Sequence, residues 1–116
     1  MSAAPVVWFE ISVKDAPKSV AFYEAMFGWK IKSSPEYNEV EKVGEGIGGG
    51  IRPTQGDQPA MTSFYIDVPD LDATLAQVVK LGGRVALPPM MLEEGLWFAF
   101  FQDPDGNFIG LSKMKK

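Results

Sequence analysis

The chain has 116 residues, of which 46% are hydrophobic and 22% charged, and this composition fits a single globular domain. It contains neither Cys nor His, which excludes disulfides, thiolate nucleophiles and the commonest ligands of transition metals. The net charge of −4 and the pI of about 4.7 argue against nucleic-acid binding, and no apolar run is long enough to cross a membrane. The first residues lack the pattern of a signal peptide, so we expect a cytoplasmic protein.

The first predicted element is a strand over residues 6–13, which are bulky and β-prone. Side chains alternate along a strand, so one face carries Val7, Phe9, Ile11 and Val13. The other face carries Trp8, Glu10 and Ser12. A face that mixes an aromatic ring, a carboxylate and a hydroxyl is more typical of a cavity wall than of a core.

A helix is predicted next. Asp15 is placed to cap it, Pro17 favours its first turn, and Gly28 can end it after about Phe27. Strand-like patterns follow over residues 29–32, 37–43 and 47–51.

Three consecutive glycines, Gly48 to Gly50, lie in the last of these strand-like segments. No Lys-Ser/Thr pair follows them, so we expect a bulge, or a surface that another backbone or a ligand approaches closely, rather than a phosphate loop. Residues 52–60, Arg52 to Ala60, are rich in Pro, Gly and polar side chains and form the predicted linker.

The second half repeats this order. A strand over residues 62–68 places Ser63, Tyr65 and Asp67 on one face. Asp70 opens a helix that ends near Leu81. A short strand is expected over residues 84–87, broken by Pro88 and Pro89, with a connection from Met90 to Gly95.

The chain closes with a predicted hairpin. Residues 97–102 are aromatic and apolar, residues 103–107 read Asp-Pro-Asp-Gly-Asn, and apolar residues resume at Phe108. Proline and glycine at these positions, with Asp side chains that can bind nearby backbone N–H groups, indicate a tight turn between two strands.

The two halves match with an offset of 55 residues, because 70 − 15 = 55 separates the two helix-capping Asp residues. Each half therefore predicts strand, helix and three further strands. We expect one domain over residues 1–116, made of modules at about 1–56 and 57–116. The fold class is α+β, with a curved, mixed but mostly antiparallel sheet, helices outside and a concave cleft.

The paired modules, the Phe22-Tyr23…Phe27-Gly28-Trp29 segment and the turn at residues 103–107 resemble the vicinal-oxygen-chelate superfamily. This group contains glyoxalase I, extradiol dioxygenases, and bleomycin- and fosfomycin-resistance proteins. The chain looks most like its small, single-domain bacterial members. The resemblance implies a homodimer, in which closed twofold pairing covers the flank of a small sheet.

Enzymes of the superfamily commonly hold a divalent metal, and the resemblance implies where its ligands would lie. One position, seven residues before the first helix-capping Asp, is Trp8; the equivalent position before Asp70 is Ser63. A third, three residues after the Asn of the final turn, is Gly110, and the fourth lies within residues 47–51. Since these positions offer poor donors or none, we expect no tightly bound metal and no cofactor.

The predicted ligand-binding residues are Trp8, Glu10, Ser63, Tyr65, Asp67 and Trp97. Glu10 is also the candidate catalytic acid or base, or an anchor for a cationic or hydroxylated ligand. Asp67 can supply a second carboxylate, and two carboxylates in one cavity can divide acid and base roles. The alternative is that Glu10 forms an ordinary ion pair with Lys or Arg. Most of the cluster formed by Phe98, Phe100 and Phe101 is expected in the core.

Two functions follow from this interpretation. The first is metal-independent binding of a small, partly aromatic or apolar molecule in the concave cleft. The second is a glyoxalase-like lyase or isomerase that acts on a small metabolite with Glu10 as acid or base, alone or together with Tyr65, and either without a metal or with a metal bound weakly by carboxylates. A purely structural role would leave the polar residues of the predicted inner face unexplained.

Overall fold

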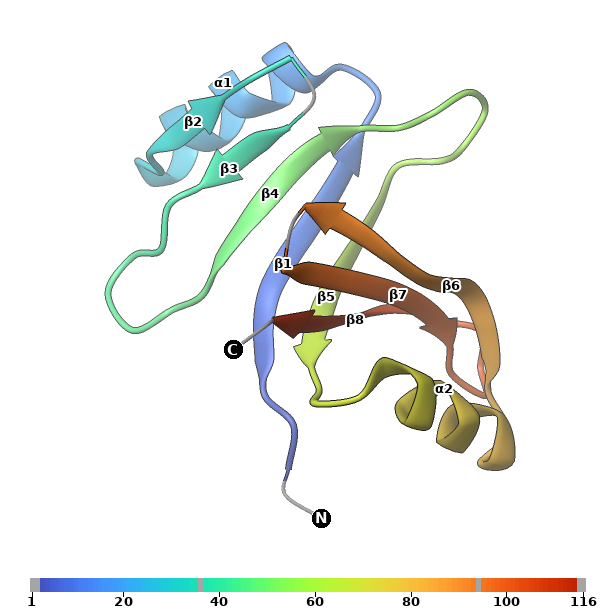
Figure 1. The fold of residues 1–116 in the computed structure, drawn as a ribbon. Coiled ribbons are helices and arrows are strands. Elements are labelled where there is room, and N and C mark those ends of the chain that lie inside the picture. The colour runs from blue at the N-terminus through green and yellow to red at the C-terminus, as the bar shows by residue number, and fades with distance from the viewer. Residues whose placement is uncertain (1–2, 36, 94, 115–116) are drawn as a thin grey trace. The chain divides into compact units, whose positions relative to one another are not determined.

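The computed structural model describes residues 3–35, 37–93 and 95–114 (Figure 1). Its elements follow the predicted order, a strand, a helix and three strands, twice. They are β1 (Val6–Val13), α1 (Ala16–Phe27), β2 (Ile31–Ser33), β3 (Asn38–Val40), β4 (Gly48–Pro53), β5 (Met61–Asp67), α2 (Leu71–Lys80), β6 (Arg84–Glu93), β7 (Leu96–Gln102) and β8 (Phe108–Met114). Four strand pairings within the modules are antiparallel and two are parallel, which confirms the α+β class.

The chain forms two compact units. The N-terminal unit contains residues 8–63, and the C-terminal unit contains the described residues from 64 onward together with residues 3–7. The start of the chain joins the C-terminal unit through a hydrogen bond of 2.9 Å from the Asp67 amide to the Pro5 carbonyl. The linker is shorter than expected, because Arg52 and Pro53 complete β4.

In the N-terminal unit the strands lie in the order β2-β3-β4-β1. The β1/β4 pair is parallel, and the other two pairs are antiparallel. The core lies between this sheet and α1, and its buried members are Val13, Val20, Val40 and Ile51. Phe9 and Ile11 pack against it, so the predicted apolar face of β1 is the one that faces the helix. Full burial of a side chain such as Ile51 stabilises the unit by about 1.5–3 kcal/mol.

Both helices begin where the sequence predicts. The Asp15 carboxylate accepts a hydrogen bond from the Lys18 amide (3.1 Å), and the Asp70 carboxylate accepts one from Ala73 (3.0 Å). Gly28 adopts a φ of 67°, the left-handed conformation that ends α1 without a Cβ clash. Within the described part of the chain, neither helix is long and apolar enough to cross a bilayer.

In the C-terminal unit the strands lie in the order β5-β8-β7-β6, with β5/β8 parallel and the other pairs antiparallel. The core between this sheet and α2 contains Val68, Leu71, Leu75, Ala99 and Leu111. The β7–β8 hairpin forms as predicted. Its turn is held by Asp103, whose carboxylate accepts hydrogen bonds from the backbone amides of Asp105 and Asn107, both 2.9 Å.

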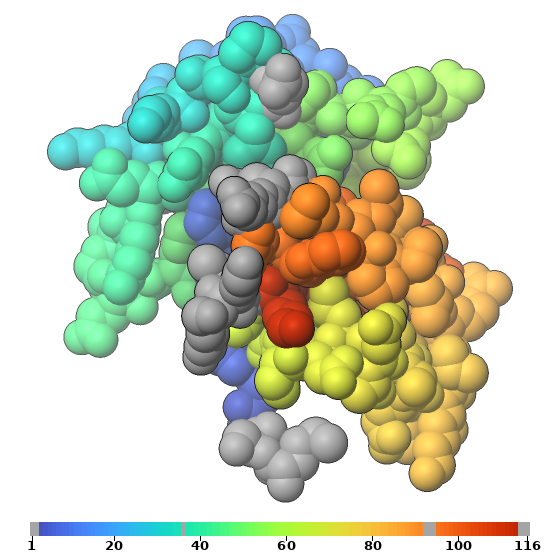
Figure 2. Space-filling model, in the orientation of Figure 1, coloured from blue at the N-terminus to red at the C-terminus, as the bar shows by residue number. Residues whose placement is uncertain are grey.

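The prediction for residues 84–95 was wrong in one respect. Pro88 and Pro89 do not end the strand, and β6 continues to Glu93. It is the last strand in its sheet, where a missing N–H costs no ladder hydrogen bond on the open side. Register shifts between Val85 and Met90 absorb the two prolines as irregularities. Side chains of residues 84–91 in β6, coloured orange, lie at the surface in Figure 2.

Candidate functional site

A chain of polar contacts lies on the face of the N-terminal unit that points away from α1. The Trp8 indole N–H donates to the Tyr37 hydroxyl oxygen at 2.8 Å. The Tyr37 hydroxyl donates to Oε2 of Glu10 at 3.4 Å, and Nη1 of Arg52 donates to Oε1 of Glu10 at 3.4 Å. Trp8 and Glu10 share this face, as strand alternation predicts, and the other two residues complete the group.

Glu10 is the buried centre of this group. The residue is 7% exposed, whereas the Arg52 side chain that forms its ion pair is 38% exposed. The structure therefore contains the ion pair that sequence reasoning considered as the alternative role of Glu10. A buried carboxylate is costly unless charged or hydrogen-bonding groups surround it, and Tyr37 and Arg52 supply both.

Tyr37, like Arg52, belongs to this group but was not predicted from the sequence as a site residue. It precedes β3 and reaches Trp8 and Glu10 across the sheet. Burial raises the pKa of Tyr37 well above its ordinary value; the hydrogen bond from Trp8 opposes this, and the charge of Glu10 adds to it. The phenol is thus neutral at physiological pH and remains a hydrogen-bond donor.

The glycine run of β4 explains how these aromatic rings fit on the sheet. A Cβ added at Gly50 would lie 1.7 Å from the Tyr37 hydroxyl oxygen, and one at Gly48 would lie 3.2 Å from the Trp8 ring. The two glycines are paired with Glu10 and Trp8 of β1, so they lie on the same face. The glycine run is a closely approached surface, but aromatic side chains of the chain itself approach it rather than another backbone or a ligand.

The equivalent face of the C-terminal unit is aromatic. Tyr65 lies over Gly110, where an added Cβ would be 2.5 Å from the ring. Its ring centroid is 5.3 Å from that of Phe100, which in turn contacts Phe98 edge-on at 6.3 Å. Ala99 and Phe101, on the opposite face of β7, belong to the core. The aromatic cluster is therefore divided between the two faces.

The remaining predicted site residues have different positions. Asp67 lies on the Tyr65 face and accepts a hydrogen bond from the Ser112 hydroxyl at 3.0 Å. Ser63 is buried, at the last position of the N-terminal unit. Trp97 lies on the Ala99 face of β7, opposite to the Tyr65 face, and is 41% exposed. The structure thus brings Trp8 together with Glu10 and places Trp97 on the face opposite to Tyr65, while a single pocket lined by Trp8, Glu10, Ser63 and Tyr65 stays a prediction.

The residues at the implied metal positions do not fit a metal ion. Trp8 and Gly110 offer no suitable donor side chain, and residues 47–51 contain only glycine and isoleucine. Ser63 is a weak ligand. In residues 3–35, 37–93 and 95–114, no three Asp or Glu side chains gather at one place, and the chain has no His or Cys. The Tyr37 and Tyr65 rings instead fill the space over the sheet.

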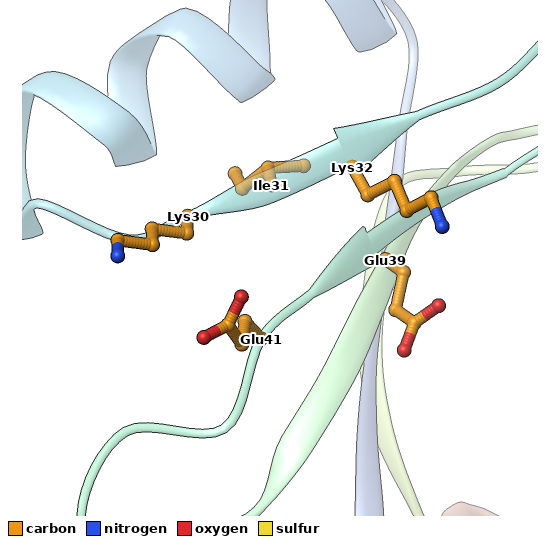
Figure 3. Close-up of a pocket in the computed structure, with 5 residues that line it drawn as sticks. All are labelled: Lys30, Ile31, Lys32, Glu39 and Glu41. Atoms are coloured by element: carbon orange, nitrogen blue, oxygen red, sulfur yellow. The ribbon is translucent and has the colours of Figure 1, made fainter.

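A shallow hollow of about 260 Å³ lies elsewhere on the N-terminal unit. Lys30, Ile31, Lys32, Glu39 and Glu41 line it. Figure 3 shows that its charged side chains come from the neighbouring strands β2 and β3 and the residues beside them. It contains charges of both signs, all on exposed residues, and none of the predicted site residues. This is the pattern of a solvated surface rather than of a ligand pocket.

Comparison with known proteins gives a consistent result. A family model described as "Glyoxalase/Bleomycin resistance protein/Dioxygenase superfamily" matches residues 6–111. A Mycobacterium tuberculosis protein named "Putative glyoxylase CFP32" is 27% identical over 113 residues, which cover 90% of this chain and 43% of that protein. The chain therefore spans less than half the length of this relative.

Solved structures share the fold. Methylmalonyl-CoA epimerase from Mycobacterium tuberculosis has a TM-score of 0.74 at 14% identity, covering 96% of this chain and 88% of the epimerase. A glyoxalase/bleomycin resistance protein/dioxygenase superfamily member from Vibrio splendidus has a TM-score of 0.68 at 18% identity, covering 96% and 99%. The resemblance found in the sequence is confirmed.

Proposed function

The chain belongs to the Glyoxalase/Bleomycin resistance protein/Dioxygenase superfamily, and we propose that it binds a small, partly aromatic or apolar molecule without a metal ion. One observation carries the proposal. At the positions where the resemblance implies metal ligands, the chain has Trp8, Ser63, Gly110 and the Gly48–Gly50 run, and aromatic rings lie on those glycines. Such a surface suits van der Waals and stacking contacts rather than coordination.

The chemistry of the N-terminal face supports this function. Trp8 presents a half-buried ring whose N–H is already bound to Tyr37, so its orientation is fixed. A rigid aromatic side chain loses little conformational freedom when a planar molecule stacks on it. The polar atoms of Tyr37, Glu10 and Arg52 lie beside that ring and can orient the bound molecule.

The second function, a lyase or isomerase with Glu10 as acid and base, has weaker support. A general base must reach the proton of a substrate. Here each carboxylate oxygen of Glu10 accepts a hydrogen bond, one from Tyr37 and one from Arg52, and the residue is 7% exposed. These contacts favour a role in holding its neighbours in place.

The proposed function can be tested with chelator-treated protein and 2-naphthol as an aromatic probe. We expect saturable quenching of tryptophan fluorescence that persists in Trp29→Phe and is lost in Trp8→Phe. Trp29 is a matched control because its ring stacks on Tyr23 beside the core, at a centroid distance of 5.2 Å. Binding that appears only after a divalent metal is added, or that survives Trp8→Phe unchanged, would contradict the proposal.

The homodimer implied by the resemblance stays a prediction. Sedimentation equilibrium at micromolar concentration should give twice the chain mass of 12.7 kDa, and a monomer mass would count against it.

A further inference from the structure

Arg52 is the charged member of the Trp8–Tyr37–Glu10–Arg52 group that meets solvent. Arg52 is paired with Ser12 in the β1/β4 register, two residues beyond the Glu10/Gly50 pair, so its side chain lies on the same face. The Arg52 side chain is 38% exposed and that of Glu10 is 9% exposed. An approaching molecule therefore meets a guanidinium group, with the compensating carboxylate beneath it.

From this arrangement we infer that the bound molecule carries an anionic group, of the carboxylate class, and that Arg52 binds it. The inference rests on the proposed function and identifies the chemical class of its ligand. A guanidinium has five N–H donors in a planar fork, and the contact to Glu10 uses Nη1. The rest of the fork can form the bidentate pair that carboxylates favour.

Glu10 positions Arg52 without neutralising it fully. Their contact of 3.4 Å is longer than the roughly 2.7–2.9 Å of a strong charge-assisted hydrogen bond. A long contact fixes the direction of the side chain, yet leaves the guanidinium able to attract a second anion. Pre-positioning also lowers the entropy that Arg52 loses when a ligand binds.

The other charged side chains on this face do not reverse the expected preference for an anion. Glu39 is paired with Gly50 across β3 and β4, and Lys32 is paired with Glu39 across β2 and β3. Cross-strand partners lie on one face, so these two exposed side chains of opposite sign are neighbours, as Figure 3 shows. Their charges largely cancel, and Arg52 remains the group that distinguishes an anion from a neutral molecule.

The spacing along β4 places an aromatic surface beside the cation. The Trp8 ring lies over Gly48, the Tyr37 ring lies over Gly50, and Arg52 follows. Successive side chains on one face of a strand are roughly 6.6 Å apart. A planar apolar body of one or two rings with a carboxylate at one end matches this row.

The inference can be tested by calorimetric titration of metal-free protein with three probes of one shape: 2-naphthoate, neutral 2-naphthamide and cationic 2-naphthylmethylammonium. We expect the wild-type chain to bind naphthoate at least about tenfold more tightly than naphthamide, as for a hydrogen bond to a charged group. Arg52→Gln should abolish this preference, so that naphthoate and naphthamide bind with equal affinity. Arg52→Lys should retain part of the preference, because it keeps the charge and loses the fork.

Arg84→Gln is the matched control. It removes the same charge from an exposed arginine of the C-terminal unit, bonded to Gln102 at 2.6 Å, and it should leave the preference intact. If naphthamide or the ammonium probe binds as tightly as naphthoate, or if Arg84→Gln reduces the preference equally, the inference fails while the proposed function stands. If none of the three probes binds, the proposed function fails and the inference fails with it.

Discussion

In both units a tyrosine ring lies on one face of the sheet, but the tyrosine comes from a different position in each unit. The ring lies over a glycine in each case. This glycine is Gly50 on β4, which runs parallel to β1, and Gly110 on β8, which runs parallel to β5. In the N-terminal unit the ring comes from Tyr37, which precedes β3, and it is held by hydrogen bonds to Trp8 and Glu10. In the C-terminal unit the ring is that of Tyr65 on β5 itself, and it packs against Phe100.

The difference shows which features the duplication has kept. The strand–helix–strand pattern and the glycine under a ring occur in both units, whereas the source of the ring and its polar partners do not. The sequence offset also changes: Glu10 and Tyr65 differ by 65 − 10 = 55, but their glycine partners differ by 110 − 50 = 60. The C-terminal unit therefore has five more residues between these strands, and β6 and β7 are longer than β2 and β3.

The largest effect is expected from adding a methyl group at Gly110. An ideal Cβ there lies 2.5 Å from Cδ2 of Tyr65 and 2.9 Å from Cγ, close to the root of the side chain. The ring cannot leave without a backbone shift, so Gly110→Ala should lower the free energy of unfolding by about 3 kcal/mol. Urea denaturation measures this change, and a loss below about 1 kcal/mol would show that Tyr65 does not depend on this glycine.

A smaller loss is expected at the equivalent glycine of the N-terminal unit. A Cβ at Gly50 meets the far end of Tyr37, its Oη and Cζ atoms, so the ring can swing out. Gly50→Ala should then cost about 2 kcal/mol, chiefly through the lost hydrogen bonds to Trp8 and Glu10. The control is the same change in a Tyr37→Ala background, where its cost should fall below about 0.5 kcal/mol. Equal costs in both backgrounds would show that the effect of Gly50→Ala does not come from its contact with the Tyr37 ring.

The charged pair of the N-terminal unit gives the next effect. Arg52→Gln removes the cation beside the buried Glu10 carboxylate and should cost about 1–2 kcal/mol, less than a fully buried pair because Arg52 is partly exposed. Arg84→Gln in the C-terminal unit should change the free energy of unfolding by less than about 0.5 kcal/mol. Denaturation of the two variants at pH 7 provides the comparison. Equal losses in the free energy of unfolding would show that Arg52 stabilises the fold no more than the exposed Arg84 does.

Alkaline pH should affect the Tyr37 network. The folded-state pKa of Tyr37 is raised, so its contribution to stability is present below the unfolded-state pKa of about 10 and is lost as the pH rises towards the folded-state value. Tyr37→Phe lacks this titration and should therefore lose less stability than the wild-type chain above about pH 10. Melting temperatures measured from pH 8 upward test the expectation; parallel curves would contradict it.

The smallest effect concerns the hairpin turns. In the C-terminal unit, hydrogen bonds from the side chain and backbone of Asn107 lower the pKa of Asp103. The ionised carboxylate therefore stabilises the turn fully at pH values above its ordinary pKa, and this contribution is lost as the pH falls through the lowered pKa. The β3–β4 turn of the N-terminal unit contains a backbone hydrogen bond from the Gly46 amide to the Val43 carbonyl (3.0 Å), like the one from Gly106 to Asp103 (2.8 Å) in the C-terminal turn. Asp103→Asn should lower the melting temperature slightly at pH 7, and this difference should shrink below about pH 3.

Much of the fold could be predicted because local physical rules determine it. Asp15, Gly28 and Asp70 fix the ends of the helices, and alternation along β1 correctly separates the Trp8 face from the Phe9 face. Pro88 misled the strand prediction, because a proline is tolerated on an edge strand and the sequence does not show which strand lies at the edge.

The site was less predictable because its residues meet through long-range pairing. Tyr37 begins the strand predicted over residues 37–43, but that pattern does not show that its ring reaches Trp8 and Glu10. Arg52 was assigned to the linker although it lies in β4. Only the β1/β4 register brings Arg52 to Glu10. Trp97 is a different case, because the sequence already contains the relevant information. Neighbouring residues of a strand point to opposite faces, so Trp97 and Phe98 are expected on different faces of β7, and the structure places them so.

Metal titration of the thermal stability tests the proposal that this chain binds its ligand without a metal ion. Chelator-treated protein is melted alone and with up to about a tenfold excess of Mn²⁺, Zn²⁺ or Ni²⁺, because any ion that binds the folded state raises the melting temperature. We predict a shift below about 1 °C for each ion. A saturable rise of several degrees near one equivalent of metal would contradict the account.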